Sequence, residues 1–475
     1  MRESAKRMSG TASWKAALMR ISPRTVPGIA LLLALTFAIV SALAPAQGLQ
    51  AQNAQSFTGV ASCAGSTCHG RSEGNGAVVR QDEIATWQEP SAVSGAHSRA
   101  YSLLGSRRGQ QITASLGMGD AREAQACLGC HATFAPVAQR GPKFRLDDGV
   151  GCESCHGPAA GWIASHYEVA GSHANNVANG LTPLDQPQAR ARVCLDCHYG
   201  STQRGQFVTH AMMAAGHPRI TFELDLFSAF QQHHNVDGDY VQRKGQPDSL
   251  QLWAVGQAEA VVRATDLFAR PDFGTQGVFP QLYFYDCHSC HRAITDGDAR
   301  RLTFETNPGR PITFGQPPFN DENIIMLGTI AQTLAPGRAD AFRDASSNFH
   351  AAMNRGRAEA QTAAIALRAE ARALSDLLAS PAGRSNDAFA VIAAIGSKAS
   401  APRFTDYAGS VQAVMAIDTM LNAMVADGRV TYGAAAGIRA DLGRAYAAVR
   451  APDSYRPGDF RTALGSATTA IGRLR

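Results

Sequence analysis

The sequence predicts a mainly α-helical protein with two regions: a cysteine-containing region with little regular strand, then an α-helical, bundle-like domain. Two observations support this prediction. All ten cysteines lie before residue 292 and come in short-spaced pairs. After Pro311 cysteine disappears, alanine becomes frequent, and apolar residues recur at helical spacing. A content of 45% hydrophobic and 17% charged residues is ordinary for a globular protein.

The N-terminal leader, residues 1–46, has the composition of a signal peptide or signal anchor. Its basic side chains outnumber its single acidic residue, Glu3, and give the leader a charge of +5, the same as the net charge of the whole chain. An uncharged apolar run at 28–44 follows, and then Ala44-Pro45-Ala46, a pattern that signal peptidase accepts. Because the rest of the chain is nearly neutral, we expect no nucleic-acid partner.

The length of the apolar run favours cleavage of this leader over its retention as a membrane anchor. The run has 17 residues, which is below the ~20 of a typical spanning helix. The basic end would stay in the cytoplasm in either case. We therefore expect a periplasmic protein, released by cleavage or anchored to the inner membrane by the leader.

The cysteines form five pairs, and a histidine follows the second cysteine of each pair. Four segments (CLGCH, CESCH, CLDCH and CHSCH) fit the C-x-x-C-H pattern of covalent haem attachment, and the first, CAGSTCH, has four intervening residues. The cysteines are Cys63, Cys68, Cys127, Cys130, Cys152, Cys155, Cys194, Cys197, Cys287 and Cys290, and the histidines are His69, His131, His156, His198 and His291.

The chemistry of haem c explains this spacing. Two thiols form thioether bonds to the two vinyl groups on one porphyrin edge, and the adjacent imidazole reaches the iron as the proximal ligand. Structural zinc, thioredoxin-like redox pairs and disulfides are the alternatives, but none of them explains a histidine after every pair. The motifs therefore predict five covalently attached haems c, and export agrees with haem attachment outside the cytoplasm.

The region that carries the motifs is short for five haems. Cys63 to His291 spans 229 residues, which is about 46 residues per haem. So short a chain cannot enclose its cofactors in a conventional core, and we expect the haems themselves to form the core. The predicted fold is therefore a multihaem c-type cytochrome domain at 57–310, with haems close enough to exchange electrons.

Nine further histidines are candidates for the distal side of the irons. His97 follows a predicted helix start after Pro90, and His166 follows the turn at Gly157-Pro158. His210 and His217 lie seven residues apart, so a helix would present both on one face; Pro218 ends that helix and favours His217 over His210. His173, His233 and His234 remain open alternatives. We expect His288 to face solvent and His350 to be structural, or else a long-range distal ligand.

Several segments resemble the multihaem cytochrome c-554 family, also called the cytochrome c-552/4 domain. The matching residues are GVGCESCHGPAAGW…H at 150–166, CLDCHYG at 194–200, THAMMAAGHPRITFELD at 209–225 and YDCHSCH at 285–291, and the TW…HSRAY stretch resembles a segment that supplies a distal histidine. The resemblance spans residues 57–295. It implies distal roles for His97, His166 and His217 and a periplasmic electron-transfer function, although tetrahaem members lack the fifth motif and the widened first one.

Two functions from different classes follow from these motifs. The favoured one is an electron carrier that passes electrons one at a time through closely packed haems to periplasmic or membrane-bound redox proteins. The alternative is an oxidoreductase of nitrite, nitric oxide or hydroxylamine at a five-coordinate haem. Among the catalytic relatives of the family, the pentahaem nitrite reductases typically carry a C-x-x-C-K motif, which this chain lacks, and the octahaem hydroxylamine oxidoreductases need more haems than this chain has motifs. A third function is a structural subunit that docks a membrane quinol oxidase.

The remaining chain predicts helices without obvious chemistry. Residues 249–269 have the pattern of an amphipathic helix, with Trp253 as a core residue. Residues 320–475 predict four or five helices packed as a bundle or against the haem domain. Their expected core positions include Leu367, Leu374, Leu378, Val414, Ile417, Leu421 and Met424, with Gly428 as a stop signal.

Overall fold

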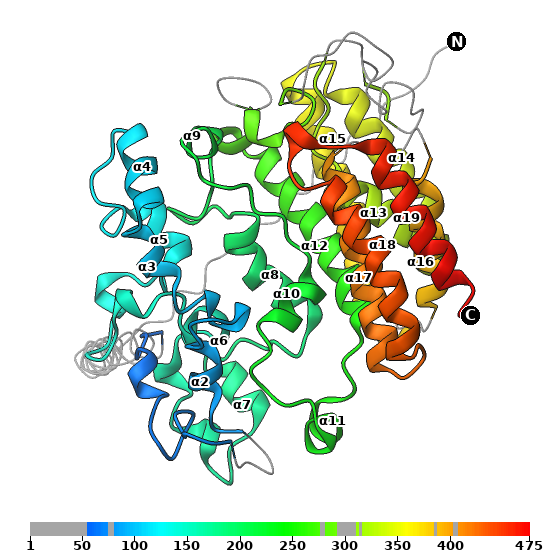
Figure 1. Ribbon diagram of the computed structural model, residues 1–475. Coiled ribbons are helices and arrows are strands. Elements are labelled where there is room, and N and C mark those ends of the chain that lie inside the picture. The colour runs from blue at the N-terminus through cyan, green and yellow to red at the C-terminus, as the bar shows by residue number, and fades with distance from the viewer. Residues whose placement is uncertain are drawn as a thin grey trace, which may run out of the picture. The chain divides into compact units, whose positions relative to one another are not determined.

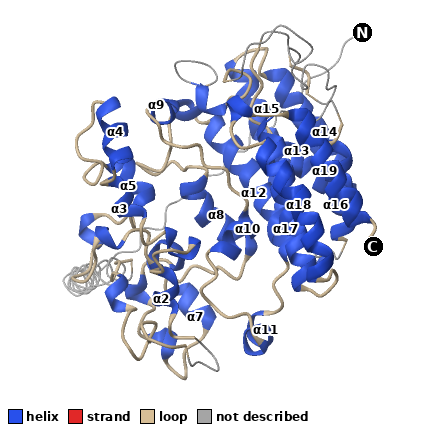
Figure 2. Ribbon diagram, in the orientation of Figure 1, coloured by secondary structure: helices blue, strands red, loops and turns tan. Residues whose placement is uncertain are grey.

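The structure is a computed structural model that describes residues 55–74, 80–275, 281–291, 310–312, 316–383, 387–401 and 407–475. The predicted leader lies outside the described residues. Gln55–Arg475 form one compact unit. The prediction of a mainly α-helical fold is confirmed, since the described residues contain helices and two isolated β-bridges but no strand (Figure 2). No helix among them is long and apolar enough to cross a membrane.

The first half of the described chain consists of short helices joined by long loops (Figure 1). Most of these helices have only five to nine residues, too few to be stable without tertiary contacts. They are α2 (Glu83–Trp87), α3 (Ala100–Leu104), α4 (Arg107–Ser115), α5 (Gln125–His131), α6 (Cys152–His156), α7 (His173–Ala178), α8 (Pro187–His198), α9 (His210–Ala214), α10 (Leu224–Phe230) and α11 (Gly238–Lys244).

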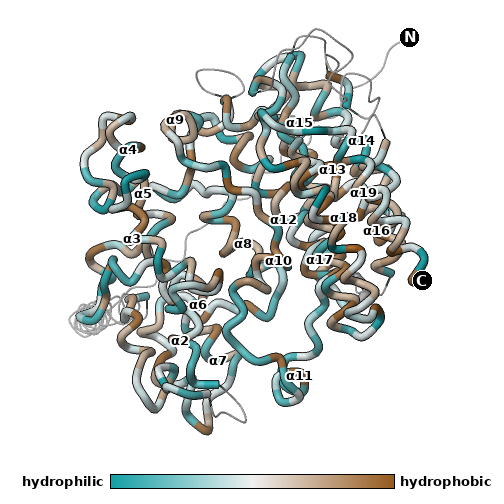
Figure 3. Tube along the Cα trace, in the orientation of Figure 1, coloured by the Kyte–Doolittle hydropathy of each residue, from teal (hydrophilic) through white to brown (hydrophobic). Residues whose placement is uncertain are grey.

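The second half consists of long helices packed side by side (Figure 1). They are α12 (Ser249–Ala269), α13 (Glu322–Leu334), α14 (Pro336–Ala352), α15 (Arg357–Ala379), α16 (Ala388–Ala399), α17 (Tyr407–Ala426), α18 (Tyr432–Ala448) and α19 (Pro457–Gly472). Apolar residues recur along these helices, whereas α4 and α11 are largely hydrophilic (Figure 3).

The prediction of four or five helices after residue 320 is wrong, because the described residues there form seven. Pro336 begins α14 only two residues after α13 ends, since proline fits the first turn of a helix but cannot continue one. Gly356, with a φ of 146°, similarly separates α14 from α15. The division into domains at 57–310 and 320–475 stays a prediction.

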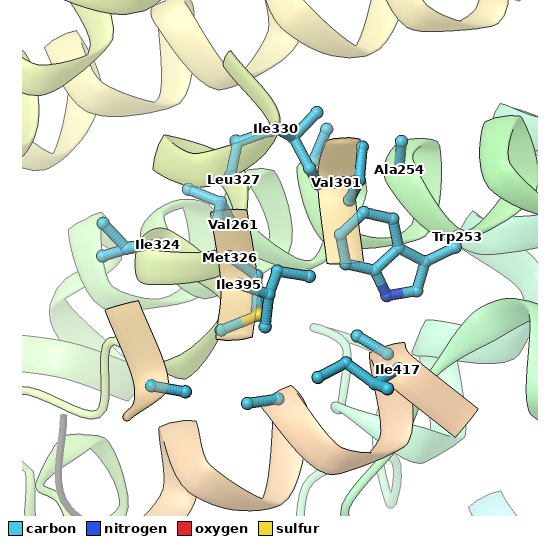
Figure 4. Close-up of a cluster of buried hydrophobic side chains, with 14 of the residues drawn as sticks. Trp253, Ala254, Val261, Ile324, Met326, Leu327, Ile330, Val391, Ile395 and Ile417 are labelled. Carbon is cyan, nitrogen blue, oxygen red and sulfur yellow. The ribbon is translucent and has the colours of Figure 1, made fainter. Parts of the chain in front are cut away.

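Helix α12, the first helix of the second half, packs against helices of both halves. The predicted bounds agree with the structure, but the predicted amphipathicity is wrong, because α12 is buried on nearly all sides. It packs against α8 and α10 from the first half and against α13, α15 and α17 from the second. In Figure 4, Trp253 lies among labelled apolar side chains of α12, α13, α16 and α17. Trp253 and the predicted core residues of α15 and α17 are buried, as expected.

Candidate haem-binding sites

The attachment motifs occupy two kinds of local structure. The second and fourth motifs end α5 and α8, and the third makes up the whole of α6; the histidine is the last residue of each helix. Residues three apart in a helix share one face, so the helix presents both thiols of a pair on the same side. The first and fifth motifs form turns, in which His69 N donates to Cys63 O (3.1 Å) and His291 N to Cys287 O (2.8 Å).

Each motif histidine faces a second histidine from another part of the chain. The ring centres are 6.3 Å apart for His69–His166, 6.3 Å for His131–His217, 6.2 Å for His156–His233, 6.2 Å for His156–His234, 6.2 Å for His198–His97 and 6.3 Å for His291–His210. We number these sites one to five in the order of their motifs.

This separation fits an iron between the two rings. An iron about 2 Å from each ring nitrogen sets two imidazole centres about 6 Å apart, since each centre lies about 1 Å behind its nitrogen. An ordinary contact between aromatic rings would also fall within about 4.5–7 Å. Other ring contacts in this chain, however, scatter from 4.2 to 6.5 Å, whereas all five sites agree within 0.1 Å. The arrangement therefore fits two imidazole ligands per iron.

Hydrogen bonds to the outer ring nitrogen fix the orientation of several of these histidines. Nδ1 donates to a backbone carbonyl in His131 (Ala100 O, 2.9 Å), His166 (Ile163 O, 2.6 Å), His217 (Pro218 O, 2.8 Å) and His233 (Gln231 O, 2.7 Å). In His69 the partner is a carboxylate, Glu83 Oε2, at 2.9 Å. This pattern leaves Nε2 with a free lone pair, which is the form that binds a metal.

Burial keeps several of these rings neutral. It lowers the pKa of His156 to about 3 and the pKa of His198 and His233 to about 4. Burial also lowers the pKa of His97. A neutral imidazole is required for ligation, because protonation would occupy the nitrogen that binds the metal. The Nδ1 atom of His198 is buried with no hydrogen-bond partner.

The predicted distal candidates fall into three groups. Four of the predicted distal histidines each lie opposite a motif histidine: His97, His166, His210 and His217. His210 and His217 are therefore not alternatives for one site, because they lie opposite different motifs. His233 and His234, which sequence reasoning left open, both face His156, and one ring nitrogen from each of the three lies within 4.8 Å of the others. His173 instead pairs with Asp185 at 3.1 Å.

Two histidines have structural surroundings. The expectation that His288 faces solvent is wrong: it is half-buried, its Nδ1 donates to Pro452 O (2.7 Å), and its ring contacts Tyr455. The contact partner lies far along the chain, which is why the local sequence did not indicate it. His350 is buried, with Nε2 3.4 Å from Asp321, in agreement with its expected structural role.

Thiols of different motifs lie close together in two places. Cys63 of the first motif lies beside Cys152 of the third, and Cys130 of the second lies beside Cys197 of the fourth. All ten cysteines lie in the described part of the chain and are free, so no disulfide competes for them. Cys68 and Cys290, the second cysteines of the first and fifth motifs, are exposed, whereas the other eight are partly buried.

Comparison with known proteins found one similar family. Residues 62–157, which hold the first three motifs, match the family described as cytochrome c554 and c-prime. The resemblance predicted from the sequence is confirmed by this match, which implies covalently bound haem c and a c-type cytochrome role in electron transfer. Searches of curated proteins and of solved structures gave no match.

Proposed function

We propose that this chain, in which residues 62–157 match the cytochrome c554 family, is an exported electron carrier with five haems c, each held by two histidines. The observation that carries the proposal is the uniform separation of 6.2 or 6.3 Å between each motif histidine and a second histidine. Bound haem c supplies an iron that alternates between two oxidation states. The residues of the chain attach it, orient it and set its potential.

The alternative function, an oxidoreductase of small nitrogen compounds, requires an iron with an open position. In the described residues every motif histidine has a facing histidine, so both axial positions can be filled at all five sites. Bis-histidine ligation leaves no position for a substrate and favours electron transfer. The electron carrier is therefore the better-supported function.

Contacts between motifs support a linear order of the sites: one, three, four, two, five. Cys63 and Cys152 bring sites one and three together, and α6 packs against α8 between sites three and four. Cys130 and Cys197 bring sites two and four together. Finally, His217 of site two and His210 of site five come from one short segment.

The ends of this order are the surfaces that we propose for redox partners. The exposed cysteines, Cys68 and Cys290, belong to sites one and five, which are the two ends. A haem edge attached there would be open to a docking protein, whereas the three middle sites are attached through partly buried cysteines. We propose periplasmic or membrane-bound redox proteins as partners, with the leader at 1–46 directing export or anchoring the chain to the inner membrane.

The haem count and spin state of purified protein test this proposal. Material matured in a host that attaches haem c should carry five haems by mass and by pyridine haemochrome. Its oxidised EPR spectrum should contain low-spin signals only. His217→Ala should convert one haem in five to high spin, and His173→Ala, which alters a histidine paired with Asp185, should convert none. Fewer than five haems, or a high-spin signal before substitution, would contradict the proposal.

A further inference from the structure

One buried carboxylate lies between histidines of two different sites. Glu83 Oε2 is 2.9 Å from Nδ1 of His69, the motif histidine of site one, and Glu83 Oε1 is 3.6 Å from Nδ1 of His234 in site three. The Glu83 side chain is only 7% exposed. Both contacts are to Nδ1, so the carboxylate leaves Nε2 of each imidazole free to bind an iron.

The surrounding chain holds this carboxylate in place. Ile84 N, next to Glu83, donates to His69 O (3.1 Å), and Trp87 Nε1 at the other end of α2 donates to Val150 O (3.1 Å), just before the third motif. On the other side, Arg80 donates to Asn235 Oδ1 at 3.2 Å, which ties the loop that carries His234 to the start of α2. These hydrogen bonds fix the position of the helix that carries Glu83 relative to the segments that carry His69 and His234.

The second oxygen of Glu83 still lacks a hydrogen bond. Oε1 is buried without a hydrogen-bond partner, and the nitrogen aimed at it is His234 Nδ1. A buried carboxylate oxygen without a donor costs free energy, so a small rotation of His234 that completes the hydrogen bond is favourable. The neighbouring His233 differs, because its Nδ1 already donates to a neutral acceptor, Gln231 O.

We propose that Glu83 is a positioning residue that bridges the Nδ1 atoms of His69 and His234. The bridge selects His234 over His233 as the distal ligand of site three. It also lowers the reduction potentials of the haems at sites one and three together. The inference rests on the proposed function. A carboxylate that accepts from Nδ1–H increases the electron donation of the imidazole and stabilises the oxidised iron. Sites one and three are neighbours in the proposed order of the sites. One side chain would therefore influence the reduction potentials of both haems that take part in the first electron transfer.

Potentiometry of the complete five-haem protein tests the bridge. Glu83→Gln keeps the shape of the side chain and removes its charge. It should raise the midpoint potentials of two haems, each by a tenfold change in the reduction equilibrium, which is about 59 mV for one electron. Glu89→Gln removes a partly exposed carboxylate just after the same helix, where Glu89 accepts a hydrogen bond from Ser91, and should change no midpoint potential. A shift of one haem only, or of none, would overturn the proposal.

Histidine substitutions identify the second haem. In a His234→Ala background, Glu83→Gln should shift only one haem, because site three no longer contacts Glu83. In a His233→Ala background it should still shift two. The opposite pattern would show that His233 is the ligand and would overturn the selection of His234.

The readouts separate this inference from the proposed function. Five haems that are all low-spin would leave the electron carrier standing even if Glu83→Gln shifted no potential. If Glu83→Gln protein does not mature, the EPR and near-infrared spectra of the unsubstituted protein decide. Two of the five haems should then show the stronger ligand field of an imidazole that donates a hydrogen bond to a carboxylate. Fewer than two such haems would overturn the proposal that Glu83 bridges the two sites.

Discussion

Arg219 Nη1 lies 2.8 Å from the sulfur of Cys287, so a guanidinium contacts the first cysteine of the fifth motif. The same guanidinium is 3.3 Å from Glu322 Oε1, which partly balances its charge. Little of this ion pair is exposed, so its field is only weakly screened by solvent. A positive charge at this position favours the reduced form of a haem at site five.

We expect Arg219→Gln to lower the reduction potential of one haem by roughly 50 mV. This shift corresponds to about 1 kcal/mol, which a partly compensated charge contributes at an effective dielectric constant of about 20. Spectroelectrochemical titration of the haem-loaded protein measures this shift. Arg338→Gln is a suitable control, because Arg338 forms an ion pair with Glu370 on the outside of the helical bundle. Equal shifts in both variants would contradict the assignment.

His288→Ala is expected to destabilise the fifth attachment loop by about 1–2 kcal/mol. The substitution removes the hydrogen bond to Pro452 O and the edge-to-face contact with the Tyr455 ring. Thermal denaturation of the haem-loaded protein measures the loss, and the haem count should equal that of the unsubstituted protein. His173→Ala, which affects only an exposed pair with Asp185, should change the stability much less.

Glu153→Gln should loosen the segment before the first motif. The buried carboxylate accepts from Thr58 N (2.8 Å), Gly59 N (2.7 Å) and Ala159 N (2.7 Å), and the amide would turn a donor toward at least one of these N–H groups. We expect a loss of about 2–3 kcal/mol. Hydrogen exchange at residues 58 and 59 should quicken. The exposed Glu123 provides the matched control, and unchanged exchange in Glu153→Gln would argue against this role.

Trp253→Ala should cost about 3–5 kcal/mol of folding free energy, because the indole is fully buried where α12 meets the other helices of the bundle. Chemical denaturation followed by far-UV circular dichroism measures the change. Ile365 on α15 is half exposed, so Ile365→Ala should cost far less. A comparable loss in the two variants would mean that the bundle core is not organised around Trp253.

The proposed positions of haem attachment could be read from the sequence alone. The invariable order of two cysteines and a histidine identifies all five motifs, because thioether attachment and proximal ligation impose a fixed local spacing. The helical fold and the extent of α12 were also predictable, since apolar residues recur at helical spacing. The surroundings of α12 were not, because burial on nearly all sides depends on which helices pack around it.

The facing histidines were harder to predict. His97, His166, His210 and His217 adjoin turn or helix signals, whereas His233 and His234 lie in a polar loop without a helical pattern. The role of Glu83 depends on contacts to residues 14 and 151 positions away, and spacing along the chain gives no sign of the second. The location of the protein and the identity of its partners stay predictions.

The pairing of histidines has a consequence for assembly. In all five sites the two rings come from positions roughly 80 to 100 residues apart, so each ligated iron would close a large loop of polypeptide. A covalent cross-link that closes about 100 residues removes enough chain entropy to contribute up to about 4–5 kcal/mol, and an iron with two ligands acts in the same sense. With haem bound at all five sites as proposed, the chain between the first and the fifth motif would therefore acquire much of its tertiary stability from its irons.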